Sequence, residues 1–315
     1  MIKKPVILDC DPGHDDAIMM MIALSSKEID VLGITTSAGN QTQEKTNNNA
    51  GRLLTLFNKT HIPLVKGAHF PLIRPLRIAA DVHGETGIDG AILPNNKANC
   101  IEGVSAPQFI HNTISKSDIP VYLVATGPLT NIANFLREYP EDKDKIASIS
   151  IMGGACFGGN ITPVSEFNIH VDPEAAEIVF NSGIHIIMSG LDVTLKAQLM
   201  NDDIKALKTT SHVGEVMGNI VDFYHKTTTR NFLAEDNAEE GAHMHDPCAI
   251  AYLIRPEIFI GRDMNVSINT QNGLGLGQTI CDYNHITGKS VNATVLFGLN
   301  RQKFADLVLE SARSY

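Results

Sequence analysis

Hydrophobic and polar positions alternate along the chain in two recurring patterns. Short apolar, β-branched runs come between longer stretches whose apolar residues recur with a helical period. The runs that predict buried strands are Pro5–Leu8, Val31–Thr36, Val121–Ala125, Ile146–Met152, Ile184–Met188 and Asn292–Leu296. The stretches that predict helices lie around residues 16–25, 42–58, 107–117, 129–138, 172–181, 213–234, 246–254 and 300–313. This alternation predicts an α/β fold: an open, mostly parallel, Rossmann-like sheet flanked by helices.

The chain shows no internal boundary. No linker rich in Pro, Gly or Ser and no run of like charges divides it, so we expect a single domain over residues 1–315. The segment 192–245 fits the alternation least, because it is more polar and charged than the rest. We expect it to form a helical excursion from the sheet, of the kind that often closes over a ligand.

Composition and charge narrow the choice of partners. With 43% hydrophobic and 19% charged residues, the chain has material for a large core. Its net charge of −10 argues against nucleic acid or an anionic membrane and favours a small neutral or cationic ligand. Five cysteines without framework or zinc spacing predict reduced thiols. Since no stretch has the length of a signal peptide or a membrane span, we expect a soluble, cytoplasmic protein.

An acidic loop follows the first predicted strand. The segment VILDCDPGHDDA carries four carboxylates, at Asp9, Asp11, Asp15 and Asp16. One or two acidic residues would cap a helix, whereas four crowded carboxylates repel and require a cation or strongly raised pKa values. All the nearby ligand atoms are oxygens, and a flexible site with several carboxylates suits Ca²⁺ better than Mg²⁺. The loop therefore predicts bound calcium.

Other polar loops are expected to meet this one. Ligands of an open parallel sheet bind at the carboxyl ends of its strands, which groups residues 9–16, 37–40, 126–130 and 153–168. The last of these loops is rich in glycine and presents three polar side chains, Asn160, Glu166 and Asn168. Their donors and acceptors suit a ligand with many hydroxyl groups, such as a sugar.

A second acidic position, Asp246, lies far along the chain, between His245 and Pro247. Taken alone, Asp before Pro is an ordinary helix cap, and this segment gains a functional reading only if it meets the acidic loop. His83, in a loop punctuated by glycine, is no more than an exposed histidine on sequence grounds. Asp172 is expected to cap a helix. The run NGLGLGQT at 272–279 lacks the spacing of a nucleotide-binding loop and predicts a loop or hairpin.

Six segments together resemble one family. They are DCDPGHDDA at 9–17, TTSAGNQT at 35–42, VHGETG at 82–87, ATGPLTN at 125–131, the GGN…SEFNI region at 158–169 and HDPCAIA at 245–251. In this order the chain resembles the calcium-dependent nucleoside hydrolases, which cleave the N-glycosidic bond of ribonucleosides to ribose and free base. Stretches such as SAGNQT, EFNI and DPEAAEIVF make it most similar to the bacterial pyrimidine-type ribonucleoside hydrolases, which implies a preference for uridine and cytidine.

The resemblance implies a role for each site residue. Calcium would be held by Asp11, Asp16, the backbone carbonyl of Thr126 and Asp246. The ribose would be bound by Asp15, Asn40, Asn160, Glu166 and Asn168, with Asp9 supporting the site from behind. Asp11 would also act as general base toward water, and His245, with His83 as a second candidate, would protonate the leaving base; which of the two acts stays open. The family also implies a homo-oligomer, a dimer or a tetramer.

Base specificity is expected to come from loops. The candidate residues are Phe157, Phe167, Phe223, Tyr224 and the stretch 225–235, and core packing is an equal alternative for each aromatic side chain. A purine-preferring or non-specific hydrolase is therefore the alternative within the family.

Two alternatives come from other classes. A phosphatase of the haloacid dehalogenase type would use Asp9 as nucleophile, since Asp9 and Asp11 imitate its acidic pair, but the chain has no Gly-Asp dipeptide for the second acidic motif. A non-enzymatic sugar- or nucleoside-binding protein would use the same polar groups, yet binding alone gives no reason to gather so many carboxylates.

Overall fold

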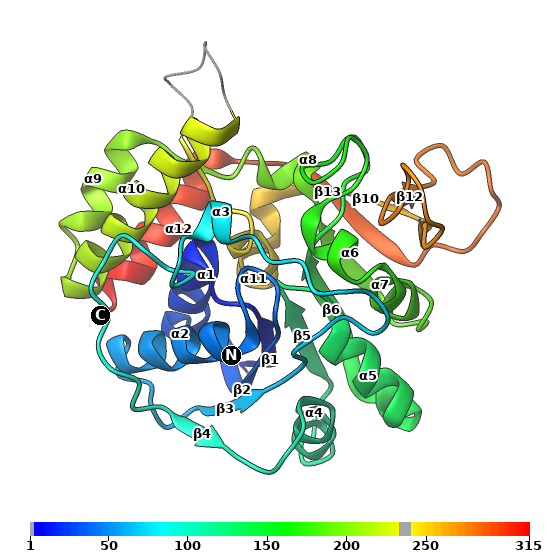
Figure 1. Ribbon diagram of the computed structural model, residues 1–315, viewed down its shortest axis with the longest axis horizontal. Coiled ribbons are helices and arrows are strands. Elements are labelled where there is room, and N and C mark those ends of the chain that lie inside the picture. The colour runs from blue at the N-terminus through cyan, green and yellow to red at the C-terminus, as the bar shows by residue number, and fades with distance from the viewer. Residues whose placement is uncertain (1–2, 233–240) are drawn as a thin grey trace.

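The computed structural model describes residues 3–232 and 241–315. Within these ranges nine strands form one open sheet, in the order β10-β13-β7-β6-β5-β1-β2-β3-β4 (Figure 1). In chain order the strands are β1 Lys4–Cys10, β2 Ile29–Thr36, β3 Pro63–Lys66, β4 Asn99–Ile101, β5 Val121–Ala125, β6 Ile146–Met152, β7 Ile186–Ser189, β10 Phe259–Met264 and β13 Ala293–Leu299. Neighbours run parallel except β10 and β13, which pair antiparallel. The prediction of an open, mostly parallel α/β sheet is confirmed.

The sheet extends at both edges beyond the six predicted strands. Each predicted strand is present with shifted ends; the run predicted at 184–188, for example, is β7 at Ile186–Ser189. The strands β3, β4 and β10 were not predicted. They lie at or next to the edges, where β4 and β10 expose most of their residues. An edge strand lacks the continuous apolar run that marks a strand buried on both faces, so the apolar pattern does not reveal it.

Helices cover both faces of the sheet. The α-helices are α1 His14–Ser25, α2 Gln43–Leu56, α3 Ala80–His83, α4 Ala106–Ile114, α5 Thr130–Glu138, α6 Phe167–Val171, α7 Pro173–Phe180, α8 Leu191–Thr194, α9 Asn201–Lys208, α10 His212–Phe232, α11 Pro247–Ile254 and α12 Arg301–Arg313. Because successive residues of a strand face opposite ways, Val6 and Leu8 of β1 pack into a core with α1, α2, α10, α11 and α12. Ile7 packs instead with α4, α5 and α7 on the other face. Figure 1 shows α9, α10 and α12 together at one side of the molecule and α4, α5 and α7 at the other.

The strand order places a crevice beside β1. From β1 the chain proceeds outward through β2, β3 and β4, whereas β5, β6 and β7 lie on the other side of β1. The direction of winding therefore reverses between β1 and β5. In doubly wound sheets the loops after two such strands diverge to opposite faces, which leaves a binding crevice at their carboxyl ends. Here those ends are the acidic loop after Cys10 and the residues after Ala125.

The described part of the segment 192–245, residues 192–232 and 241–245, is largely helical, as predicted, since it contains the end of α8, then α9 and α10. It also contains a feature that the sequence did not predict: β8 Gln198–Leu199 pairs antiparallel with β9 Ala242–His243. The run 272–279 connects β11 Val266–Ile268 to β12 Thr279–Cys281, and these pair as an antiparallel hairpin. In the parts of the chain that the structure describes, no helix combines the length and the apolar character needed to cross a membrane.

Candidate active site

Asp9 lies behind the crevice. Its carboxylate, near the end of β1, accepts hydrogen bonds from the Thr35 hydroxyl (2.6 Å) and the Asn131 side-chain amide (2.7 Å). The side chain is only 2% exposed and is absent from the lining of the ligand cavity described below. Burial raises its pKa to about 6. Asp9 therefore ties β1 to β2 and to α5 through these two hydrogen bonds.

Asp11 and Asp16 both accept hydrogen bonds from Asn40. The Asn40 backbone N–H donates to Asp11 Oδ2 (2.6 Å), and its side-chain Nδ2 donates to Asp16 Oδ2 (3.1 Å). The other oxygen of Asp16 accepts from the Thr126 hydroxyl (2.8 Å). The backbone must pass very close here, because a Cβ on Gly39 would lie 2.1 Å from Asp11 Oδ2. The loops after β1, β2 and β5 thus converge as the sheet topology predicts.

Asp246 reaches the same place from the start of α11. Its backbone N–H donates to Asp15 Oδ2 at 3.4 Å, across 231 positions of sequence. Carboxylate oxygens of Asp15, Asp16 and Asp246 all lie within 4.8 Å of one another. An ordinary capping aspartate would accept a hydrogen bond from its own helix, but the Asp246 side chain makes no such bond. Helix capping therefore does not account for Asp246.

The electrostatics of this cluster favour a cation. Asp11, Asp15, Asp16 and Asp246 are at most 4% exposed. Burial raises the pKa of Asp11 and of Asp16, and raises that of Asp15 to about 7. Burial, and then the charges of its neighbours Asp15, Asp16 and Asp11, raise the pKa of Asp246 well above its usual range. Positive charge among these groups would relieve both the desolvation and the repulsion.

One unpartnered atom tests whether the residues fit a metal. Asp11 Oδ1 is fully buried and has no hydrogen-bond partner among the described residues. A buried carboxylate oxygen rarely lacks a partner, and a hard cation is a natural one. The donors at hand are all oxygens, which is the set that such a cation prefers. The geometry also brings Asp15 into the group, a residue that the sequence reasoning assigned to the sugar.

Three of the predicted sugar-binding residues, Asn160, Glu166 and Asn168, lie in the segment after β6, whereas Asp15 and Asn40 belong to the acidic cluster. Glu166 precedes α6 and accepts from the backbone N–H groups of Asn168 (2.9 Å) and Gly154 (2.9 Å), so it also shapes the glycine-rich loop. Burial raises its pKa to about 7. Asn168 Nδ2 donates to the Thr126 carbonyl (2.9 Å), the atom that the resemblance implies as a metal ligand. Asn160 is exposed, and its Oδ1 accepts from the Phe167 N–H (2.9 Å).

Asp172 is structural, as expected. Its carboxylate accepts from the Ala175 N–H in the first turn of α7 (3.1 Å) and from the Thr130 hydroxyl (2.6 Å).

Two histidines face the cluster from other elements. His245 Nδ1 lies 2.8 Å from the Thr194 hydroxyl, and His83 Nδ1 lies 3.1 Å from Nδ1 of His14. The His83 ring is buried and the His245 ring is partly buried, and desolvation lowers the pKa of His245 to about 3 and that of His83 well below its usual range. The sequence reasoning passed over His14. Its position inside the acidic motif, between Gly13 and Asp15, was the signal that could have drawn attention to it.

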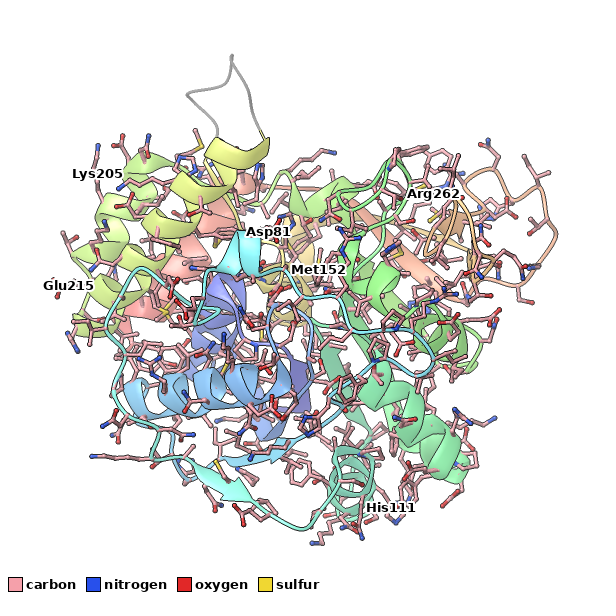
Figure 2. The ribbon with its side chains drawn as sticks, viewed as in Figure 1. Asp81, His111, Met152, Lys205, Glu215 and Arg262 are labelled. Carbon is pink, nitrogen blue, oxygen red and sulfur yellow. The ribbon has the colours of Figure 1, made fainter. Side chains whose placement is uncertain are left out.

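These groups surround one cavity of about 740 Å³. Its polar lining includes Asp15, Asn40, Thr126, Asn160, Glu166, Asn168, Asp246, His83 and His245. Asp11 and Asp16 are not among the lining residues, but both accept hydrogen bonds from Asn40, which is. Asp81, in α3, and Met152, at the end of β6, also line it, and Figure 2 labels both residues near the centre of the view.

The candidate base-specificity residues separate into two groups. Tyr224 and Phe167 line the cavity, and Tyr224 is 4% exposed. Phe223 stacks on His14 (ring centroids 5.5 Å apart), whereas Phe157 is 66% exposed and packs on Tyr283 and Phe297 of the neighbouring hairpin and sheet. Of the stretch 225–235, Thr228 in α10 lines the cavity, and residues 233–235 lie outside the described part of the chain.

Comparison with known proteins gives consistent matches. The family of inosine-uridine preferring nucleoside hydrolases matches residues 6–306. The pyrimidine-specific ribonucleoside hydrolase RihA of Shewanella oneidensis is 50% identical over 99% of this chain and 96% of its own, and RihA of Escherichia coli O127:H6 is 47% identical over 99% of both chains. Among solved structures, a purine-preferring ribonucleoside hydrolase from Gardnerella vaginalis superimposes with a TM-score of 0.90 at 30% identity, over 98% of both chains. The plant nucleoside hydrolase PpNRh1 gives 0.89 at 28% identity, over 99% of both chains.

Proposed function

The chain belongs to the inosine-uridine preferring nucleoside hydrolase family and is thus an N-glycosidase, and from this premise we propose that it hydrolyses pyrimidine ribonucleosides, uridine and cytidine, to ribose and free base. The observation that carries the proposal is the meeting of Asp246 with Asp15 and Asp16 at a cavity that also presents Asn40 and Asn168. Carboxylates for a cation lie next to paired donors and acceptors for a sugar. Neither a phosphatase nor a simple binding protein needs that combination, and the family membership decides against both.

The cation we propose is Ca²⁺. Asp11, Asp16, Asp246 and the Thr126 carbonyl would hold it, and the unpartnered Asp11 Oδ1 supports this assignment. When bound, calcium would supply the positive charge that orients and acidifies a water molecule. The Thr126 carbonyl has a second lone pair beyond the one that Asn168 uses, so it can serve as a neutral ligand.

Some residues of the chain would act at the ribose of the substrate and others at its base. Departure of the base leaves positive charge on C1′ and the ring oxygen, which the surrounding carboxylates would stabilise. Asp11 would take the proton of the attacking water, and Asp9 would support the site from behind. Asn40, Asn160, Glu166 and Asn168 would bind the ribose hydroxyls. His245 or His83 would assist the departing base.

The base preference gives the first test. We expect kcat/KM to be at least about tenfold higher for uridine than for inosine, since one contact with a base edge is worth about 1–3 kcal/mol. The relatives named as pyrimidine-specific support this direction. A reducing-sugar assay across uridine, cytidine, inosine and adenosine measures it. Faster hydrolysis of inosine than of uridine would replace the proposal with a purine-preferring enzyme, like the neighbour from Gardnerella vaginalis.

A second test separates sugar contact from metal contact at Asp15. If Asp15 binds the ribose, Asp15→Asn lowers kcat/KM for uridine by about 10²-fold or more while calcium affinity, measured by calorimetry, changes little. If Asp15 is instead a metal ligand, calcium affinity falls with activity. Asp16→Asn is the matched comparison, because this change removes a proposed ligand and weakens calcium binding in either case.

We further propose that the enzyme forms one domain and acts in the cytoplasm as a homotetramer. Strands from Lys4 to Leu299 share one sheet, which supports a single domain. All five cysteines are free, as suits a reducing compartment. Several large apolar side chains are exposed on the side of the β11–β12 hairpin, namely Ile260, Ile280, Tyr283 and Ile286, and these would suit a contact between subunits.

A further inference from the structure

Two buried histidines contact each other at the cavity wall, where His83 is a lining residue and His14 is not. His14, in the first turn of α1, is fully buried, and His83, at the end of α3, is 6% exposed. Their Nδ1 atoms are 3.1 Å apart, a hydrogen-bonding distance. The other nitrogen of His14, Nε2, lies 3.0 Å from the backbone carbonyl oxygen of Asp89. His14 thus bridges the loop after α3 and the ring of His83.

The backbone carbonyl of Asp89 determines which nitrogens of His14 and His83 carry protons. A carbonyl oxygen only accepts, so His14 Nε2 must carry a proton and donate it to Asp89. A neutral imidazole has one donor and one acceptor, and full burial beside a second imidazole favours the neutral ring at His14. His14 Nδ1 is then the acceptor, so the proton between the two rings belongs to His83 Nδ1. A neutral His83 consequently has a bare lone pair on Nε2.

Packing holds both rings in this arrangement. His14 stacks on Phe223 and Tyr224, with ring centroids 5.5 and 5.3 Å away, and His83 stacks on Tyr224 at 5.8 Å. On the other side, a Cβ on Gly13 would lie only 2.5 Å from His83 Nδ1. Only glycine leaves room for the His83 ring at this position. His83 lines the cavity and His14 does not. Because His14 engages Nδ1 of His83, Nε2 is the ring nitrogen left for a ligand.

We propose that His14 is a positioning residue, which fixes His83 as the Nδ1–H tautomer and so presents His83 Nε2 to the cavity as a hydrogen-bond acceptor. The ligand group that it would take is a hydroxyl or an N–H of the nucleoside. His245 differs in this respect, because its partner, the Thr194 hydroxyl, can donate or accept and imposes no tautomer. Of the two histidines, His83 is therefore the one held as an acceptor, whereas both tautomers are open to His245.

The tautomer can be read directly, whatever the protein's activity. Nitrogen-15 NMR of the full-length, ligand-free protein labelled at histidine distinguishes a protonated ring nitrogen from a bare one, and the spectrum of His83→Gln identifies the His83 signals. Near neutral pH we expect His83 to carry its proton on Nδ1 and none on Nε2. A proton on Nε2 of His83 in the wild-type protein would overturn the proposal without recourse to any variant.

Two substitutions of His14 then test its positioning role. His14→Phe keeps a ring to stack on Phe223 and Tyr224 but removes both hydrogen bonds, so we expect mixed tautomers at His83. His14→Asn retains an oxygen near the position of Nδ1, which should restore the Nδ1–H tautomer. Unfolding temperatures establish that each variant is folded. An unchanged His83 tautomer in folded His14→Phe, or a tautomer that His14→Asn fails to restore, would contradict the role.

The kinetic consequence rests on the proposed function. An acceptor bond to a substrate hydroxyl or N–H exists in the bound ground state as well as the transition state. We therefore expect His14→Phe to raise KM for uridine about five- to tenfold with little change in kcat, and His14→Asn to recover most of the loss. A fall in kcat with KM unchanged would instead make His83 a proton donor. If uridine is not hydrolysed at all, the proposed function fails while the NMR result still decides the tautomer.

Discussion

Replacing Asp11 by Asn is expected to reduce kcat for uridine by about 10⁴-fold. In the proposed mechanism Asp11 holds the cation and accepts a proton from water, and an amide side chain does neither well. Its Oδ1 is the buried atom without a partner, while its Oδ2 is held by the Asn40 backbone N–H at 2.6 Å. Because the geometry of Asp11 is fixed by that bond, the loss should fall on catalysis and not on folding. Steady-state kinetics of ribose release, with thermal unfolding of the same sample, measure both.

A matched control changes the same functional group elsewhere. Asp118 is exposed and lies just before β5, at the opposite end of that strand from Thr126. Asp118→Asn removes one negative charge without touching the cavity, so its kcat should stay within about twofold of the wild-type value, as surface substitutions do. Retention of more than about a tenth of the activity in Asp11→Asn would remove Asp11 from the mechanism, since general bases contribute at least 10²-fold.

Removal of calcium is expected to have an effect of similar size. Without the cation, four carboxylates at most 4% exposed face one another, and nothing orients the water. A chelator selective for calcium over magnesium should therefore abolish ribose release. Calcium added back in excess should restore it, whereas magnesium should not, because its rigid octahedron suits this set of side chains poorly. Equal restoration by both ions would leave a metal site but reject the assignment to calcium.

The same ion should stabilise the fold. A ligand at about 100 times its Kd contributes about 2.7 kcal/mol to the free energy of unfolding, so calcium should raise the Tm of the wild-type protein by several degrees. Asp246→Asn should lose this calcium-dependent rise. In the metal-free protein it should unfold at a higher temperature than the wild type, because one buried charge that repels Asp15 and Asp16 is gone. A lower metal-free Tm in this variant would mean that the Asp246 carboxylate is stabilised by something other than a cation.

The sequence by itself determined the central sheet and the chemistry of its loops. Six buried strands show continuous apolar runs because both faces of a parallel sheet are covered, and four carboxylates after the first of them already require a cation or raised pKa values. The sheet rule placed the loops after β1, β2, β5 and β6 at one edge, and the contacts of Asp11 with Asn40 and of Thr126 with Asn168 follow that rule.

Only the tertiary structure decided which distant groups meet. From the sequence alone, Asp246 before Pro247 is an ordinary helix cap. It joins the acidic cluster only because α11 packs against α1, which brings it to Asp15 across 231 positions of sequence. The bond between His14 and His83 has the same origin, since it joins α1 to α3 through a gap that Gly13 leaves open. The periodicity of apolar residues shows which face of a helix or strand is buried. It carries no distance between side chains on separate elements, and the tautomer of a histidine depends on just such a distance.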